Sequence, residues 1–527
     1  MTAGFLMAAL LLSACSESGP LPFVPTAEPT PEQPREVTVV ALDRTSGDPV
    51  PGVQVSAAGS AVPALTDASG QAVVTAMRGA ALELRADGYD PASAKVPDSG
   101  ELQVEIRSNV VSGVVTDADG KPLAGVRVFV DGSTDFARTD AAGSYSLGNV
   151  PETGTLVYKM PGFRLVELAI DPQMTADVAM QSFEARALYA PGAVFEAPGR
   201  LDQLLDLIDR TEVNAMVIDV KETGGWLYYE TDLPEAVASG AAARPIFDLA
   251  ELLPKLKERG IYTIARMVCM KDNTVGASEP ELAVRNSATG EPWRDNNGGI
   301  WLDPAAPGVA EYLAAIAGDL ADKGFDEVQL DYIRFFSDGP YDVAHTNLPN
   351  TQSFRLPAIR RVLRVISDRM QAEKAFLSAD VFPISFIVPD DQGIGQRPEV
   401  IMPYVDYFSP MVYPSHYGPG VFGHPVPNTA PYDVIDKTLK IMNREAAGLT
   451  MKIRPWIQDF GYGDFPPYTA AQVREEMRAV ADNGAYGWMI WNARAFFTEA
   501  ALGPPRDDED PSPITSVQPA PSPSAGG

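Results

Sequence analysis

The sequence predicts a multidomain protein in which two small all-β sandwiches are followed by a (β/α)8 TIM barrel. Three observations lead to this fold class. The chain of 527 residues is longer than one hydrophobic core supports, which is about 250 to 300 residues. Residues 35–182 consist of short alternating apolar runs separated by Gly, Pro and Asp, a pattern typical of β-sandwiches. From about residue 185, apolar strands alternate with longer helical stretches.

The composition narrows the classes of function. The chain carries 70 acidic and 41 basic residues, a formal net charge of -29, so a polyanion such as nucleic acid would be repelled and a neutral polymer is the better expected partner. It has two cysteines, Cys15 and Cys269, and three histidines, too few for a disulfide framework or an obvious zinc centre. No phosphate-binding glycine motif occurs between a strand and a helix. We therefore expect no metal and no cofactor, and the oligomeric state stays open.

The N-terminus has the pattern of an export signal. Residues 1–15 form an apolar run of small and aliphatic residues that ends at Cys15, too short for a permanent membrane span. Leu-Ser-Ala-Cys at residues 12–15 resembles the bacterial lipobox, which implies that Cys15 is acylated and anchors the protein in the cell envelope, at the outer membrane where two membranes are present. No Lys or Arg precedes the apolar run, so an ordinary secretory signal is the alternative. Residues 16–34 are rich in proline and are expected to form an extended tether.

Two copies of one β plan follow the tether, at residues 35–107 and 108–182. PVPGVQVSA in the first corresponds to PLAGVRVFV in the second, and TDASGQAVV corresponds to TDAAGSYSL. The second copy resembles the carboxypeptidase regulatory-like family of small β-sandwiches, and the first is a looser version. The resemblance implies modules without a catalytic group. We expect structural spacers, with carbohydrate binding as the alternative.

Residues 183–502 are expected to form the barrel. Eight strand candidates begin near residues 187, 214, 262, 327, 376, 407, 452 and 486. Repeated βα units with apolar strands predict a parallel sheet covered by helices, and eight units match a closed barrel; an open, doubly wound sheet is the alternative. The last segment, residues 503–527, is rich in Pro, Asp and Ser and is predicted to be a disordered tail.

Polar residues end nearly every predicted strand of the barrel. TIM-barrel enzymes carry their reactive groups at these C-terminal ends, so the side chains should converge on one pocket. Glycoside hydrolysis needs two carboxyl groups beside the bond that is cleaved, and the candidates are Asp331, Asp380 and Asp459, which end strands four, five and seven. The expected substrate-binding residues are Asp219, Lys221, Arg266, Arg334, Tyr413, His416, Trp491 and Asn492.

The motifs at these strand ends carry a resemblance. GFDEVQLDYIRF, VIDVKETGG, YFSPMVYPSHY, IRPWIQDF and GWMIWNA resemble a bacterial glycosyl hydrolase domain family of unknown function, a predicted TIM barrel, over residues 185 to 500. The resemblance implies a hydrolase that acts on an oligo- or polysaccharide, without naming the sugar. More distantly, the order of Asp331, Asp380 and Asp459 is similar to the nucleophile, acid/base and stabiliser of the α-amylase superfamily. That superfamily has glutamate at the second position, so the shorter Asp380 leaves retention or inversion of configuration open.

The hypothesis that follows is a retaining hydrolysis. Asp331 attacks the anomeric carbon, Asp380 protonates the leaving oxygen, and Asp459 binds sugar hydroxyls. Three basic residues could bind an acidic sugar or simply neutralise adjacent aspartates: Lys221, Arg266 and Arg334.

Two other classes of function remain. One is a non-catalytic surface lipoprotein whose barrel binds glycan or cell wall. The other is a different polysaccharide-modifying reaction, by a lyase or a deacetylase. The shortage of histidines at strand ends disfavours a metal-dependent deacetylase.

Overall fold

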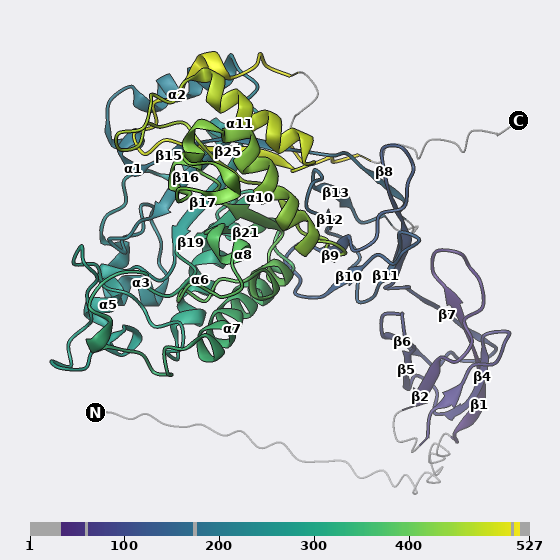
Figure 1. The fold of residues 1–527 in the computed structure, drawn as a ribbon. Coiled ribbons are helices and arrows are strands. Elements are labelled where there is room, and N and C mark those ends of the chain that lie inside the picture. The colour runs from purple at the N-terminus through teal and green to yellow at the C-terminus, as the bar shows by residue number, and fades with distance from the viewer. Residues whose placement is uncertain (1–32, 58–61, 172–175, 507–510, 517–527) are drawn as a thin grey trace, which may run out of the picture. The chain divides into compact units, whose positions relative to one another are not determined.

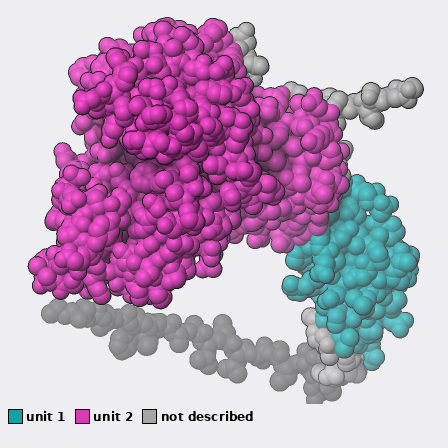
Figure 2. Space-filling model, in the orientation of Figure 1, with its two compact units in different colours: residues 1–108 teal, residues 109–527 magenta. Residues whose placement is uncertain are grey.

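The computed structural model describes residues 33–57, 62–171, 176–506 and 511–516. The chain divides into two compact units, residues 1–108 and 109–527 (Figure 2). Cys15 and nearly all of the expected tether lie outside the described residues, so the lipid anchor stays a prediction. Within the described part of the chain, no helix combines the length and the hydropathy needed to cross a membrane.

The first unit is a β-sandwich. Its strands are β1 (Arg35–Asp43), β2 (Gln54–Ala57), β3 (Ala64–Leu65), β4 (Gln71–Ala76), β5 (Ala81–Arg85), β6 (Ala92–Lys95) and β7 (Leu102–Ile106). They form two sheets, in the orders β4-β1-β7 and β3-β2-β5-β6. Strand β4 shows why these residues fold this way: Ala72, Val74 and Ala76 are buried while the residues between them are exposed, as expected where one face of a sheet packs on a core.

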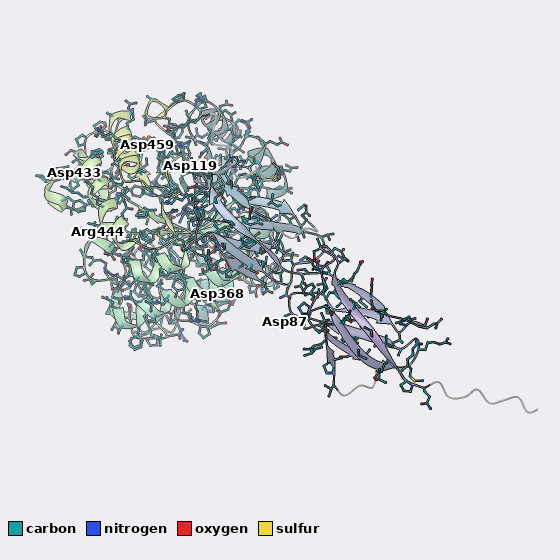
Figure 3. All side chains as sticks on the ribbon, turned by 90° about the vertical axis from the view of Figure 1, so that its right-hand side faces the viewer. Asp87, Asp119, Asp368, Asp433, Arg444 and Asp459 are labelled. Atoms are coloured by element: carbon teal, nitrogen blue, oxygen red, sulfur yellow. The ribbon has the colours of Figure 1, made fainter. Side chains whose placement is uncertain are left out.

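The second module repeats this topology element by element. Its strands are β8 (Val111–Asp117), β9 (Arg127–Val130), β10 (Phe136–Arg138), β11 (Ser144–Leu147), β12 (Thr155–Lys159), β13 (Val166–Ala169) and β14 (Val178–Met180). Their orders, β11-β8-β14 and β10-β9-β12-β13, are those of the first module shifted by seven strands. Buried Thr66 and Thr139 occupy equivalent places, because each hydroxyl accepts from a backbone N–H and donates to a backbone carbonyl. The repeat inferred from the sequence is confirmed. Asp119, labelled in Figure 3, lies in the turn after β8, where its backbone N–H donates to the Asp117 carboxylate.

Eight parallel strands form the barrel (Figure 1). They are β15 (Ala185–Ala190), β16 (Ala215–Lys221), β17 (Tyr262–Val268), β19 (Glu327–Asp331), β21 (Phe376–Val381), β22 (Tyr407–Pro410), a seventh strand in two pieces, β23 (Lys452–Ile453) and β24 (Trp456–Gln458), and β25 (Gly487–Trp491). The seventh strand was expected to be continuous. It is interrupted at Pro455, which has no N–H to donate to a ladder, so β23 pairs with β22 and β24 pairs with β25.

The sheet closes, because β15 pairs with both β16 and β25. The (β/α)8 barrel is confirmed and the open sheet is excluded. The helices are α1 (Gly192–Glu196), α2 (Arg200–Asp209), α3 (Pro234–Ser239), α4 (Leu249–Lys257), α5 (Asn273–Ser278), α6 (Val309–Asp322), α7 (Gln352–Met370), α8 (Ile384–Ile387), α9 (Pro398–Ile401), α10 (Pro431–Glu445) and α11 (Ala470–Asp482), and a two-residue ribbon pairs β18 (Arg285–Asn286) with β20 (Ala344–His345).

The charged side chains of the barrel interior lie near the two ends of its strands. Near the N-terminal ends of the strands, Glu327 on β19 forms an ion pair with Arg454, and both side chains are buried. The Arg454 guanidinium also lies 4.2 Å from the centre of the Tyr407 ring. Apolar side chains such as Ile264 and Met489 lie in the next part of the interior. Gln329 lies between Glu327 and Asp331 on β19 and is also buried there, with its amide donating to Met489 Sδ at 3.3 Å, and charged groups return at the C-terminal ends of the strands.

This ion pair gives a stability prediction. Replacing Arg454 with Met leaves the buried Glu327 carboxylate without its cation, and we expect the free energy of unfolding to fall by about 3–5 kcal/mol. Arg478→Met is the matched control, because Arg478 pairs with Glu475 on the surface of α11 and such pairs contribute about 0–1 kcal/mol. Denaturant unfolding of both variants measures the difference. An equal loss of stability in the two variants would contradict this account of the barrel interior.

The second module is part of the same compact unit as the barrel and packs against the N-terminal ends of β21 and β22. Lys159 is fully buried, and its ammonium donates to the backbone oxygen of Glu373 at 2.7 Å. Arg127 forms an ion pair with Asp406, which precedes β22. The Tyr407 hydroxyl accepts from the backbone N–H of Gly162 at 2.8 Å. The structure therefore shows that this module packs directly against the barrel, at the end opposite to the strand ends where a site is expected, and its role as a spacer stays a prediction.

The end of the chain also differs from the sequence prediction. Residues 503–527 were expected to have nothing to bury. Ile514, however, pairs in parallel with Val166 and packs against the core of the second module. Its backbone donates to Leu165 and accepts from Glu167. Ile514 thus extends the edge of the sheet at β13, since a strand edge can bind an extended segment of suitable side chains.

Candidate active site

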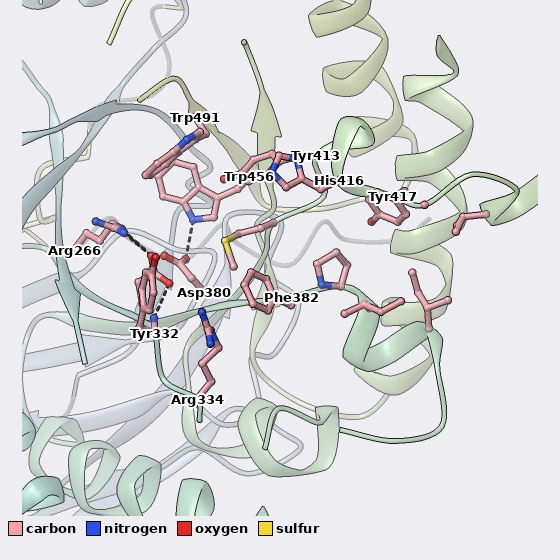
Figure 4. A pocket seen from close by; sticks show the side chains of 17 residues that line it. Arg266, Tyr332, Arg334, Asp380, Phe382, Tyr413, His416, Tyr417, Trp456 and Trp491 are labelled. Atoms are coloured by element: carbon pink, nitrogen blue, oxygen red, sulfur yellow. Dashed lines mark hydrogen bonds and ion pairs between the residues drawn. The ribbon is translucent and has the colours of Figure 1, made fainter. Parts of the chain in front are cut away.

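A pocket of about 480 Å³ opens at the C-terminal ends of the barrel strands. Figure 4 shows side chains from several strands and the loops after them converging on it. The lining residues are Arg266, Asp331, Tyr332, Arg334, Asp380, Phe382, Pro383, Ile384, Ile387, Met411, Tyr413, His416, Tyr417, Gly418, Val421, Trp456 and Trp491. Seven of the eleven residues predicted for the site line this pocket: Arg266, Arg334, Tyr413, His416 and Trp491, together with Asp331 and Asp380. Its volume is in the range of small-molecule sites.

Asp331 ends strand β19 and is held by Arg266 from the neighbouring strand β17. Arg266 donates to Asp331 Oδ2 from Nη2 at 2.5 Å and from Nε at 3.1 Å. The other oxygen, Oδ1, accepts from the backbone N–H of Tyr332 at 2.6 Å. Several charge-assisted hydrogen bonds fix the direction of the carboxylate, as a group that acts on a bound substrate requires.

Asp219, on β16, lies behind this pair and does not line the pocket. It accepts from Arg266 Nη1 at 2.5 Å and from the Tyr189 hydroxyl. Burial raises the pKa of Asp219 to about 7, against the opposing effect of the Arg266 charge. Asp219 is therefore placed to orient Arg266, which in turn orients Asp331, and the expected contact of Asp219 with substrate does not fit its place outside the pocket lining.

Tyr332 has an uncommon backbone conformation directly after Asp331. Its φ is 51°, in the left-handed region that bulky residues rarely adopt. Such conformations cost free energy and are concentrated at functional sites. Here the conformation turns the Tyr332 N–H back onto Asp331 while the ring lines the pocket.

Asp380 ends strand β21 on the other side of Asp331. Its side chain is buried and lines the pocket, and the indole Nε1 of Trp456 donates to its Oδ1 at 2.7 Å (Figure 4). Burial, and next the negative charge of Asp331, raise the pKa of Asp380 well above the usual range for an aspartate. Asp380 therefore keeps its proton at pH values where an exposed aspartate has lost it, which suits a general acid.

Aromatic rings form one wall of the pocket. Trp491 stacks on Tyr189 with ring centroids 4.0 Å apart, and the Trp456 ring meets Trp491 edge to face at 5.5 Å. Tyr413 and His416 continue this wall, and burial lowers the pKa of His416, so that its ring is neutral at pH 7. Flat apolar faces of this kind bind the faces of sugar rings. Trp226, Tyr228, Trp293 and Trp301 do not line the pocket.

Lys221 was expected to bind substrate, and the structure places it elsewhere. Its ammonium forms a fully buried ion pair with Asp272 at 2.8 Å and donates to the backbone oxygen of Val268. The pairing of β16 with β17 shifts between Asp219 and Lys221. This bulge removes Lys221 from the inward-facing row to which Asp219 belongs.

Asp459 and Asn492 also do not line the pocket. The Asp459 carboxylate accepts from the backbone N–H and the hydroxyl of Thr498, at 2.6 and 2.7 Å. Asn492 donates to the backbone oxygens of Asp459 and Phe496. Both residues organise the loop after β25, in place of the expected contact with sugar hydroxyls.

The sequence analysis missed several residues of this site, among them Tyr332, Phe382 and Met411, which line the pocket, and Tyr189, which stacks on Trp491 behind it. Tyr189 carried a usable signal, because it ends strand β15 two residues after inward-facing Ala187. Phe382 and Met411 lie just beyond β21 and β22. Their position in the pocket depends on how the loops after these strands fold, and the alternation of residues along a strand does not predict this.

The fold and the pocket together define a class, a TIM-barrel protein with a carboxylate-bearing pocket at the C-terminal ends of its strands. Residues 187–497, more than half of the chain, match the family described as Putative glycosyl hydrolase domain, and the chain belongs to this family. Residues 110–181 match the Carboxypeptidase regulatory-like domain. No curated protein matches the chain.

Several solved structures are similar to parts of this chain. A hypothetical protein from Ruminiclostridium thermocellum is 36% identical, covering 37% of this chain and 97% of its own, with a TM-score of 0.33. The glycoside hydrolase domain of PgaB (BpsB) from Bordetella bronchiseptica is 14% identical over 59% of this chain and 95% of its own, with a TM-score of 0.41. The spore cortex-lytic enzyme SleL from Bacillus cereus is 11% identical over 60% of this chain and 72% of its own, with a TM-score of 0.36.

Proposed function

We propose that the barrel hydrolyses glycosidic bonds of a polysaccharide by a retaining mechanism, with Asp331 as the nucleophile and Asp380 as the acid and base. One observation carries the proposal. A single pocket contains a carboxylate fixed by an arginine and, beside it, a buried carboxyl group with a raised pKa. Two carboxyl groups with different proton affinities are what glycoside hydrolysis needs. Membership of the Putative glycosyl hydrolase domain family supports the same reaction class.

The proposed steps follow from the contacts of each group. Asp380 gives its proton to the leaving oxygen as the glycosidic bond breaks, while Asp331 forms a bond to the anomeric carbon. Water then attacks this carbon, Asp380 takes its proton, and Asp331 leaves as a carboxylate again paired with Arg266. The Trp456 indole stabilises the charged form of Asp380 between the two steps by its hydrogen bond.

Hydrolysis of a glycan panel tests the proposal. The full chain is incubated with bacterial and plant polysaccharides, new reducing ends are measured, and NMR records the anomer that forms first. We expect a product with the configuration of the substrate. An inverted product would make Asp331 a base for water rather than a nucleophile. Glycan binding without any new reducing end would instead support the alternative, a non-catalytic surface protein.

We also propose that the protein is anchored to the cell envelope by a lipid on Cys15. The lipobox-like residues 12–15 and the proline-rich residues after them support this. Cells grown with a clickable palmitate should label the wild-type protein and not Cys15→Ser, which should leave the membrane fraction. Equal labelling of the two proteins would exclude the anchor.

A further inference from the structure

We propose that Arg334 binds a carboxylate carried by the substrate, so that the pocket accepts a sugar with an acidic substituent. This inference rests on the proposed function and adds the chemical class of the sugar. The sequence left three basic residues as candidates for such a contact, and their partners in the structure separate them.

Two of the three cations are already paired. Lys221 forms its ion pair with Asp272, and Arg266 divides its guanidinium between Asp219 and Asp331. The charge of each is already matched by a carboxylate of the protein, and Lys221 does not line the pocket.

Arg334 differs from both. It is only 6% exposed and lines the pocket. Its Nη1 donates to the backbone oxygen of Phe335 at 2.9 Å. Among the described residues, no carboxylate forms an ion pair with Arg334 and no group accepts from its Nε or Nη2. Neither nitrogen is among the fully enclosed atoms that lack a partner, so both are open to the pocket.

Aromatic rings hold this guanidinium in place. Its central carbon lies 4.8 Å from the centroid of Trp301, 4.9 Å from that of Tyr332 and 4.8 Å from that of Phe382. Figure 4 shows Arg334 between Tyr332 and Phe382, close to Asp380. Rings offset part of the charge by cation–π attraction, but this contact leaves Nε and Nη2 without a hydrogen-bond acceptor among the described residues.

A buried cation without an anion is unfavourable, and burial lowers the pKa of Arg334. A carboxylate from the ligand would provide the missing anion and can accept two parallel N–H bonds from the planar guanidinium. The net charge of -29 disfavours a densely charged polyanion. The combination fits a glycan with isolated acidic sugars, whose charge is a carboxylate on the ring or on an ether substituent.

Matched pairs of sugars test this inference on the full chain. The probes are glucuronate with glucose, galacturonate with galactose, and N-acetylmuramate with N-acetylglucosamine, and NMR titration gives each dissociation constant. We expect at least one acid to bind tenfold or more tightly than its neutral partner. The pair that shows the preference distinguishes a ring carboxylate from an ether-linked one. The methyl ester of that acid should lose the preference.

Arg334→Met should reduce the ratio to less than threefold. Arg360→Met is the matched control, because Arg360 is an exposed arginine on α7, and it should keep the wild-type ratio. The unfolding temperature of Arg334→Met should not fall, because an unpaired buried charge is removed. Equal affinity for acid and neutral sugar in the wild type, or a preference that survives in Arg334→Met, would overturn the inference. Binding is measured without turnover, so a lack of hydrolysis on every glycan would contradict the proposed function alone.

Discussion

Replacement of Asp331 by Asn is expected to lower kcat/KM about a thousandfold on any glycan that the wild type hydrolyses. The amide keeps the shape and can still accept from the Tyr332 N–H, but it removes the negative charge that the anomeric carbon meets in the transition state. Loss of one preorganised electrostatic group typically costs about 10²–10³-fold, and loss of the attacking group adds to this. The fall should be similar for good and poor leaving groups.

The control for this variant is Asp342→Asn, an exposed aspartate on the loop after β19 that does not line the pocket. Its kcat/KM should stay within twofold of the wild type. Thermal unfolding of both variants checks that Asp331→Asn is folded, because the change leaves Arg266 with one ion partner fewer inside the barrel. Full activity of folded Asp331→Asn would remove Asp331 from the mechanism.

Replacement of Asp380 by Asn should have an effect that depends on the leaving group. General acid catalysis contributes about 10²–10⁴-fold, so natural glycans should lose about that much. A dinitrophenyl glycoside, whose leaving group needs no proton, should lose much less in the bond-breaking step. The Asn side chain can still accept from the Trp456 indole, so that contact is preserved. Equal losses on both substrates would argue against Asp380 as the acid.

The pH dependence of the wild type follows from the raised pKa of Asp380. The protonated form is the active acid, so activity should fall as pH rises through that pKa, and the alkaline limb should vanish in Asp380→Asn. Stability should change in the same direction. Asp219, with a pKa of about 7, binds a proton in the folded state between about pH 4 and pH 7, where an unfolded aspartate has lost it. The free energy of unfolding should therefore decrease across this window, as measured by denaturant unfolding at several pH values.

The strand pattern located the centre of the pocket. Asp331 and Asp380 were found because parallel strands in a barrel all end on one face, and each lies at or next to the end of a fully buried strand. The sequence could also have excluded Asp459 from the pocket. Side chains alternate along a strand, and Trp456 faces the interior, so Gln458 follows it inward while Asp459 faces the other way.

Other features needed three-dimensional information. Lys221 stands two residues after inward-facing Asp219, so alternation predicts that it faces the pocket, and only the bulge between them reverses this. The role proposed for Arg334 depends on the lack of an ion pair with any carboxylate among the described residues. The sequence does not show which side chains lie near Arg334 in space. Likewise, the sequence pattern of β12 does not predict that Lys159 donates to the backbone oxygen of Glu373, more than two hundred residues later.

That contact of Lys159 bears on how such proteins can be assembled from parts during evolution. The cations that accompany Asp406 belong to the second module, so a gene exchange with a junction near residue 183 would separate each partner from the other and uncover the Phe376 and Tyr407 rings. A junction near residue 108 follows the boundary between the two compact units. Shuffled relatives should therefore carry the second module and the barrel as one inherited block, with different sequences joined in front of it.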